Sequence, residues 1–100
     1  TMFNSIDCLL TPAMPVPTPT LTKMGEYGED PTILNSILRY TAPFDFSGHP
    51  SITLPNGVDA DGLLHSMQII GPWLAEDVLI AAGHAYQTVT DWHRRHPDVG

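Results

Sequence analysis

Short apolar runs, separated by proline, glycine and acidic residues, dominate the pattern of this chain. Ile6–Leu10, Ser51–Leu54 and Leu64–Ile70 have the length and composition of strands. The first of them precedes a Thr-Pro pair and is expected to be buried. The dipeptides Asn56-Gly57 and Asp61-Gly62 are typical of turns, so the second and third strands should form a hairpin.

The first predicted helix begins at Asp30-Pro31, because aspartate can cap free amides and proline suits the first helical turn. It should end near Tyr40, because Pro43 opposes its continuation. Two loops precede it. A proline-rich loop at residues 12–19 should be extended and unable to join a central sheet ladder. An acidic loop at residues 23–30 contains two glycines and three acids.

The second predicted helix is the longest element and runs from Ala75 to about His93. Its apolar stripe consists of Val78, Ala82, Tyr86, Val89 and Trp92. Gly83 lies within it and costs about 1 kcal/mol relative to alanine, unless a strand packs closely there. The predicted order is therefore strand, helix, two strands, helix. This is an α/β arrangement of about three strands and two helices, too small to cover both faces of its own sheet.

Charge and cysteine content narrow the range of partners and locations. Four Lys and Arg face eleven Asp and Glu, a formal net charge of −7. Because nucleic-acid binding needs clustered basic residues, we expect no nucleic-acid partner. The apolar runs are shorter than the roughly 20 residues that span a bilayer, and no basic leader is present, so no membrane partner is expected. The single cysteine, Cys8, cannot form an internal disulfide, which favours the cytoplasm.

No residues form a complete catalytic, metal or cofactor site by sequence alone. Asp45, Ser47 and His49 are the residue types of a Ser-His-Asp triad, but triads are built from distant segments. His93 and His96 have the spacing of paired metal ligands and lack a third ligand nearby. A phosphate-binding glycine loop is also absent. The sequence therefore predicts no catalytic residue, no metal and no cofactor.

The stretch Tyr40–Pro55 carries the strongest family signal. It reads Tyr-Thr-Ala-Pro-Phe-Asp-Phe-Ser-Gly-His-Pro-Ser-Ile-Thr-Leu-Pro. It is followed by Asp61–Pro72, which contains Gln-Ile-Ile-Gly, and then by the acidic start of a helix at Glu76–Leu79. These runs resemble, in content and order, the C-terminal segment of amidase signature hydrolases. Asp7–Pro12 and Trp92–Pro97 fit the same pattern, so the resemblance covers nearly the whole chain.

The resemblance implies that residues 1–100 are the C-terminal part of an amidase domain, with a mixed β-sheet core flanked by helices. Members of the family hydrolyse carboxamide C–N bonds through an acyl-enzyme on serine. A second serine, in a cis peptide, and a lysine move the protons, and backbone amides form the oxyanion hole. The matching serine loop is absent, and Lys23 matches no catalytic lysine. These residues are expected upstream of Thr1, so the chain alone is expected to be inactive although its parent is a hydrolase.

The resemblance also implies roles for six residues of this chain. Those expected to line the acyl pocket are Thr41, Phe44 and Leu38, and those expected to hold the local structure are Gly48, Pro50 and Gln68. The alternative for the first three is a closely packed helix-to-strand junction. Gly48 should be small because backbone passes close to it, and Gln68 should bond backbone rather than substrate. The expected partners are a small amide substrate and the rest of the amidase domain, or a second copy of the chain.

Departures from the family pattern separate the candidate functions. Asp45 stands where asparagine is more common, and Leu64 stands where proline is usual. The glutamine-using subunit of the tRNA-dependent amidotransferase typically has aspartate at the position of Leu38, to hold the ammonium of glutamine. Leucine cannot make that contact, so an amidase with an apolar or aromatic acyl group is favoured over the amidotransferase. The third alternative is a free-standing binding or scaffold domain, which requires apolar faces that are covered within 100 residues.

Overall fold

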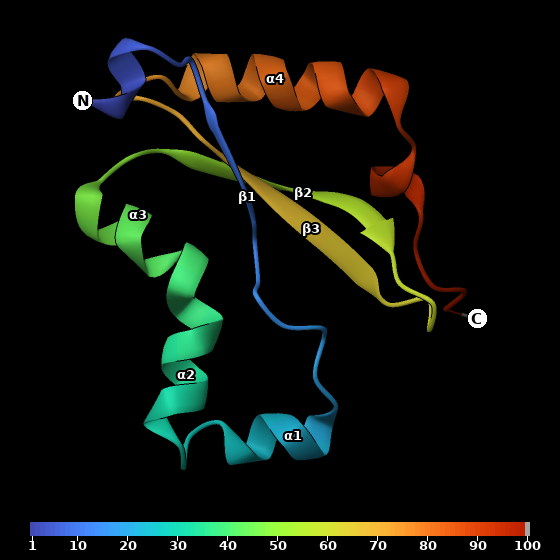
Figure 1. The fold of residues 1–100 in the computed structure, drawn as a ribbon. Helices are drawn as coiled ribbons and strands as arrows, with labels where there is room; N and C mark the ends of the chain where they lie inside the picture. Colours follow the sequence, from blue (N-terminus) through green and yellow to red (C-terminus); the bar gives the residue numbers. More distant parts are fainter. Residues whose placement is uncertain (100) are drawn as a thin grey trace.

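A computed structural model describes residues 1–99 as an antiparallel sheet flanked by helices (Figure 1). Its three strands lie in the order β1-β3-β2 and comprise β1 (Leu9–Pro12), β2 (Ser51–Val58) and β3 (Leu64–Ile70). The helices are α1 (Leu21–Glu26), α2 (Pro31–Ile37), α3 (Ala42–Ser47) and α4 (Glu76–Val89), with 3-10 turns η1 (Met2–Asn4), η2 (Leu38–Tyr40) and η3 (Trp92–Arg94). The predicted α/β class and strand number are confirmed. The helices number four rather than two within the described residues.

The β2–β3 hairpin confirms the predicted pairing and corrects its details. Ser51 pairs with Ile70 and Val58 with Leu64, so β2 is longer than predicted and Pro55 does not end it. Asn56-Gly57 is not a turn. It lies in β2 where the register shifts between Pro55 and Gly57, because a bulge accommodates residues that cannot keep the regular ladder. The turn forms at residues 59–63, as Asp61-Gly62 predicted.

Helix α4 covers one face of the hairpin and creates the main core. Leu54 of β2, Ile69 of β3 and Leu79 of α4 are buried together, and the partly buried side chains of Cys8, Ile52, Met67, Ala82 and Tyr86 pack against them. Gly83 of α4 lies against β2 in this core. A Cβ added there would lie 3.0 Å from Ile52 Cδ1 and 3.5 Å from Leu54 Cδ1. The close approach of β2 explains a glycine in the middle of the helix.

The segment between β1 and β2 is more helical than the sequence predicted. Helix α1 replaces the first half of the expected acidic loop, and Thr20 caps the helix by accepting a hydrogen bond from the Lys23 amide. Helix α2 begins as predicted, with the Asp30 carboxylate accepting from the Thr32 amide. The helical segment ends near Tyr40 as predicted, after the 3-10 turn η2, but the sequence analysis did not predict the new helix α3 at Pro43. Proline occupies the first turn of α3, where its missing amide proton costs nothing.

Strand β1 lies later in the chain than predicted and forms an edge of the sheet. Leu9 pairs with Ile70 and Pro12 with Met67, so the strand includes the proline that was expected to end it. An edge strand tolerates proline because one side of its ladder is free. Leu10 is 64 % exposed, so this strand is also less buried than expected.

The described chain leaves much apolar surface open. Its accessible area is 7266 Å², whereas a folded protein of this mass exposes about 5,600 Å². Its radius of gyration is 15.5 Å, against about 13 Å for a complete domain of this length. Figure 1 shows why, since α1 and α2 extend away from the sheet instead of packing on it. None of the helices in residues 1–99 combines the length and apolarity that crossing a membrane requires.

Candidate functional site

The junction between η2 and α3 holds the residues predicted to line a pocket. The Leu38 carbonyl accepts from the Thr41 amide at 3.2 Å, and the Thr41 carbonyl accepts from the Phe44 amide at 3.1 Å. These hydrogen bonds fold the three predicted residues into consecutive turns. Thr41 and Phe44 are half-buried and Leu38 is exposed. Their role in substrate binding stays a prediction.

Gln68 fastens this junction to the sheet. Its side chain is 3 % exposed, and its Nε2 donates to the Tyr40 carbonyl at 2.8 Å. A longer contact of 3.4 Å joins the same nitrogen to Thr11 Oγ1. Because Tyr40 directly precedes Thr41, the hydrogen bond from Gln68 fixes the position of the junction relative to the sheet. A buried amide without hydrogen-bond partners would destabilise the fold. Both acceptors of Gln68 Nε2 belong to this chain.

Gly48 and Pro50 shape the connection from α3 to β2. Gly48 ends α3 with φ of 73°, in the left-handed region that favours glycine, and its amide donates to the Phe44 carbonyl at 2.9 Å. Apart from its two chain neighbours and its own helix, nothing in residues 1–99 lies within 4 Å of a Cβ built at Gly48, so within these residues the positive φ is what favours glycine. The expected close approach of backbone stays a prediction. The Pro50 carbonyl accepts from the Gly71 amide at 3.0 Å and thereby aligns the start of β2 with the end of β3.

Ser47 and His49, separated by Gly48, form a hydrogen bond that the sequence analysis did not expect. Ser47 Oγ lies 2.7 Å from His49 Nδ1. The arrangement is not a catalytic triad, because a hydrolase histidine contacts its serine through Nε2 and its aspartate through Nδ1. No hydrogen bond or ion pair joins Asp45 to His49 within residues 1–99. The left-handed turn at Gly48 brings the two side chains together.

An aromatic cluster surrounds His49 and borders a cavity of about 500 Å³. The centroid of the His49 ring lies 5.2 Å from that of Phe3 and 5.3 Å from that of Trp73. Trp73 Nε1 donates to the Ser47 carbonyl at 3.0 Å, which anchors the indole to the α3–β2 turn. Sequence reasoning missed this cluster. Its members come from η1, the turn before β2 and the residues after β3, and only the sheet brings them together.

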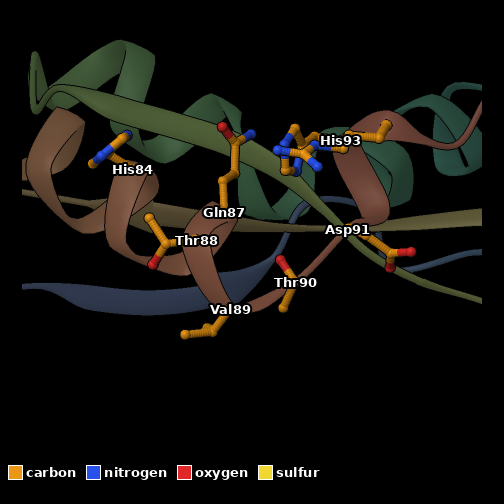
Figure 2. Close-up of a pocket in the computed structure, with 8 residues that line it drawn as sticks. His84, Gln87, Thr88, Val89, Thr90, Asp91 and His93 are labelled. Atoms are coloured by element: carbon orange, nitrogen blue, oxygen red, sulfur yellow. The ribbon is translucent and has the colours of Figure 1, made fainter.

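A second cavity, of about 540 Å³, lies beside the C-terminal end of α4 (Figure 2). In this view His84 lies to the left of Gln87, and His93 and Asp91 lie to its right. No group of three or more His, Cys, Asp or Glu side chains is placed to hold a metal ion in the part of the chain that the structure describes. His96, the predicted companion of His93, contacts the Pro97 carbonyl through Nδ1 at 3.1 Å.

Ionisable groups elsewhere lie on the surface and stabilise local structure. Lys23 pairs with Glu26 at 3.3 Å on α1, where both side chains are more than half exposed. Asp59 accepts from the amides of Leu63 and Asp61, both at 2.9 Å, and lies 3.5 Å from His65 Nε2. The hydrogen bond from Leu63, followed by that from Asp61 and the charge of His65, lowers the pKa of the Asp59 carboxyl.

Comparison with known proteins places this fold in a family. The family model described as Amidase matches residues 1–80. A protein of Mycobacterium tuberculosis named "Putative amidase AmiD" is 43% identical over 98 residues, which are 98% of this chain and 21% of that protein. The glutamyl-tRNA(Gln) amidotransferase A subunit of Microcystis aeruginosa is 39% identical over 95 residues, 95% of this chain and 19% of that relative. The chain thus spans about one fifth of the length of these curated relatives, and it belongs to the amidase signature family.

Proposed function

We propose that this chain forms one wall of the acyl pocket in an amidase that hydrolyses carboxamide C–N bonds. The observation that carries the proposal is the buried amide of Gln68, which holds Tyr40 and therefore the adjoining Thr41 at a fixed place on the sheet. A pocket wall needs side chains fixed in this way, because small displacements of a bound acyl group slow the reaction strongly. Thr41, Phe44 and Leu38 are the proposed wall.

The catalytic groups of the proposed enzyme come from a segment upstream of this chain. They are a serine nucleophile, a second serine in a cis peptide and a lysine that relays protons. Lys23 does not fill the last role, because it is paired with Glu26 on the exposed side of α1. Ser47 does not fill the first, because its hydroxyl contacts His49 Nδ1 and the Phe44 carbonyl rather than a second serine or a lysine. A small amide is the proposed substrate, and a cytoplasmic location stays a prediction from the single cysteine.

The open apolar surface supports an incomplete catalytic domain over a free-standing scaffold domain. Both outer strands leave one edge without a partner among residues 1–99. Helices α1, α2 and α3 contain no buried residue. A self-sufficient scaffold would cover such edges and faces, because they promote association. The rest of an amidase domain is the proposed cover.

A chimera tests the proposal directly. This chain would replace the 98 aligned residues of the Mycobacterium tuberculosis relative, and ammonia release from aliphatic and aryl amides would be measured. We expect the chimera to be active and the isolated chain to be inactive. Thr41→Leu should change kcat/KM unequally among substrates with different acyl groups, by about 10-fold between the extremes. The matched control is Thr22→Leu on exposed α1. An equal fall for all substrates would reduce Thr41 to a packing residue.

The alternative is the glutamine-using subunit of the tRNA-dependent amidotransferase. Several relatives of 36–39% identity carry the name glutamyl-tRNA(Gln) amidotransferase. Leu38 disfavours this function, because an apolar side chain cannot hold the ammonium group of glutamine. The same chimera distinguishes the two functions. If glutamine is its best substrate, the amidotransferase function replaces the general amidase. If position 38 does line the pocket, Leu38→Asp should improve glutamine hydrolysis relative to that of aryl amides.

A further inference from the structure

Helix α3 is joined to distant parts of the chain by a side-chain hydrogen bond at each end. Gln68 Nε2 donates to the Tyr40 carbonyl, two residues before the helix begins, and Trp73 Nε1 donates to the Ser47 carbonyl at its last residue. Among residues 1–99, the side-chain hydrogen bonds that span more than ten positions all come from these two donors. Gln68 fixes the end next to Thr41, which leaves the other end to Trp73.

A helix as short as α3 does not fix its own orientation. It has six residues, whereas an isolated helix needs roughly 12 to be even marginally stable in water, and Gly48 ends it with a left-handed φ of 73°. Ser47 lies about one turn after Phe44, whose carbonyl accepts from the Gly48 amide at 2.9 Å. A group that fixes the Ser47 carbonyl therefore also fixes the turn that carries Phe44.

The indole of Trp73 is oriented so that its N–H points at one acceptor. Indole is a donor only, and its N–H lies in the ring plane, so the plane decides which acceptor it reaches. The ring stacks on His49 with centroids 5.3 Å apart and an interplanar angle of 28°. His49 Nδ1 in turn lies 2.7 Å from Ser47 Oγ. Ser47 is therefore bound through its carbonyl by Trp73 and through its hydroxyl by His49.

The backbone that carries Trp73 is fixed relative to the sheet. The Gly71 amide, two residues earlier, donates to the Pro50 carbonyl at 3.0 Å, directly after the fully buried Ile70 of β3. Leu74, the next residue after Trp73, has φ of 63°, in the left-handed region that favours glycine. A leucine in this conformation is strained and persists only where surrounding contacts impose it. The contacts on both sides of residue 73 therefore set where the indole lies.

We propose that Trp73 is a positioning residue, whose indole N–H fixes the C-terminal end of α3 and, through it, Phe44 in the acyl pocket. The effect on the pocket rests on the proposed function, whereas the effect on α3 does not. Gln68 and Trp73 fix opposite ends of the same short helix, one beside Thr41 and the other one turn beyond Phe44. Loss of the indole N–H lets the Phe44 end move, and a small displacement of the wall changes which acyl groups react well.

Deuterium exchange in the chimera described above tests the effect on α3 without any need for activity. Trp73→Phe removes the N–H and keeps an aromatic ring beside His49. Loss of one hydrogen bond makes local opening about fivefold more frequent, so the amides of residues 44–48 should exchange about fivefold faster. Exchange that matches the parent chimera would overturn the proposal.

Trp92→Phe is the matched control for this measurement. The Trp92 ring contacts the Arg95 guanidinium, whose Cζ lies 4.3 Å from the ring centroid, and within residues 1–99 its indole donates no hydrogen bond to α3. It removes the same indole N–H from a different part of the chain, so residues 44–48 should exchange as in the parent. Equal acceleration in both variants would show a general loss of stability and would contradict a specific role of Trp73.

Substrate preference then tests the effect on the pocket. Trp73→Phe should lower kcat/KM for benzamide about fivefold more than for propionamide, because the larger acyl group contacts more of the wall. Trp73→Leu, which also loses the ring, should shift this ratio in the same direction and to a similar extent. A shift in Trp73→Leu without one in Trp73→Phe would assign the effect to the ring and overturn the role of the N–H.

The two readouts separate this inference from the proposed function. Equal falls in kcat/KM for both amides in Trp73→Phe would show that Trp73 supports the fold without positioning the wall. A chimera that hydrolyses neither amide, but in which Trp73→Phe still speeds exchange at residues 44–48, would contradict the proposed function and confirm that Trp73 fixes α3.

Discussion

The two halves of this molecule, one built on α4 and the other on α1 to α3, differ in how they are held. Helix α4 buries Leu79 and Gly83 against β2 and β3 and contributes to a shared core. The three earlier helices contain no buried residue, although together their sequences contain more large apolar side chains than α4 does. The difference lies in what faces them. Within residues 1–99, α4 is the one α-helix that buries side chains against the sheet.

The less buried half is tied to the sheet by polar contacts. Gln68 reaches the Tyr40 carbonyl, and Trp73 reaches the Ser47 carbonyl. Each bond joins the sheet side of the molecule to a backbone group near the proposed pocket wall. Such contacts fix position but contribute little free energy compared with a buried core. The half that carries the candidate site is therefore accurately placed but weakly stabilised.

The largest expected effect is association of the isolated chain through the uncovered half. Leu21 and Met24 are exposed on α1, and we expect Leu21→Ser with Met24→Ser to reduce self-association measured by sedimentation velocity. Ile80→Ser on the outer side of α4 is the matched control, since Ile80 is 65 % exposed next to a covered face. A monodisperse parent chain with a sharp thermal transition would contradict this comparison and favour the free-standing scaffold domain.

The second effect is the stability of the core itself. Leu79→Ala should lower the free energy of unfolding by about 2–5 kcal/mol, because it leaves a cavity against Leu54 and Ile69. Leu34→Ala, at an exposed position of α2, should cost less than about 1 kcal/mol. Urea denaturation followed by circular dichroism measures both. Similar losses at the two positions would mean that α2 is packed as firmly as α4.

The better-packed half is also the half that the sequence predicted well. The apolar run of β3 and the turn at Asp61-Gly62 were predicted correctly, and Gly83 marked the close approach of β2. The apolar stripe predicted for α4 was only partly right. Ala82 and Tyr86 pack on the core, whereas Val78 and Val89 are exposed, Leu79 is the buried side chain, and the helix ends at Val89. Pairing inside the hairpin is local, so a local pattern suffices to predict it.

The N-terminal helices were predicted less well because their signals are caps rather than apolar patterns. Thr20 caps α1, and Pro43 lies in the first turn of α3, a helix that the sequence analysis did not predict after the expected stop near Tyr40. The His49 cluster had no local signal at all. Phe3 and Trp73 are far from it in sequence, and the strand order brings them together.

The third prediction concerns the hydrogen bond from Gln68 to the Tyr40 carbonyl, which joins the two halves. Gln68→Leu removes the donor that satisfies the Tyr40 carbonyl and should cost about 1–3 kcal/mol of unfolding free energy. In the chimera it should also change acyl-group preference in the same direction as Thr41→Leu, because the junction is no longer fixed. Gln87→Leu, a half-buried position on α4, is the control. A stability loss without any change in preference would separate the junction from the proposed pocket.

The smallest effect concerns the turn that joins β2 to β3. The pKa of Asp59 is lowered in the folded chain, chiefly by the Leu63 amide. The turn's stabilisation is therefore fully present above the carboxyl's unfolded pKa and is lost as pH falls through the lower folded value. Amide exchange at Asp61 and Leu63 should accelerate over that acidic range, and Asp59→Asn should remove the pH dependence. Asp45→Asn is the control, because the Asp45 carboxylate accepts no backbone amide in the described structure. Equal acid sensitivity of the parent and Asp59→Asn chains would assign the effect to other carboxylates.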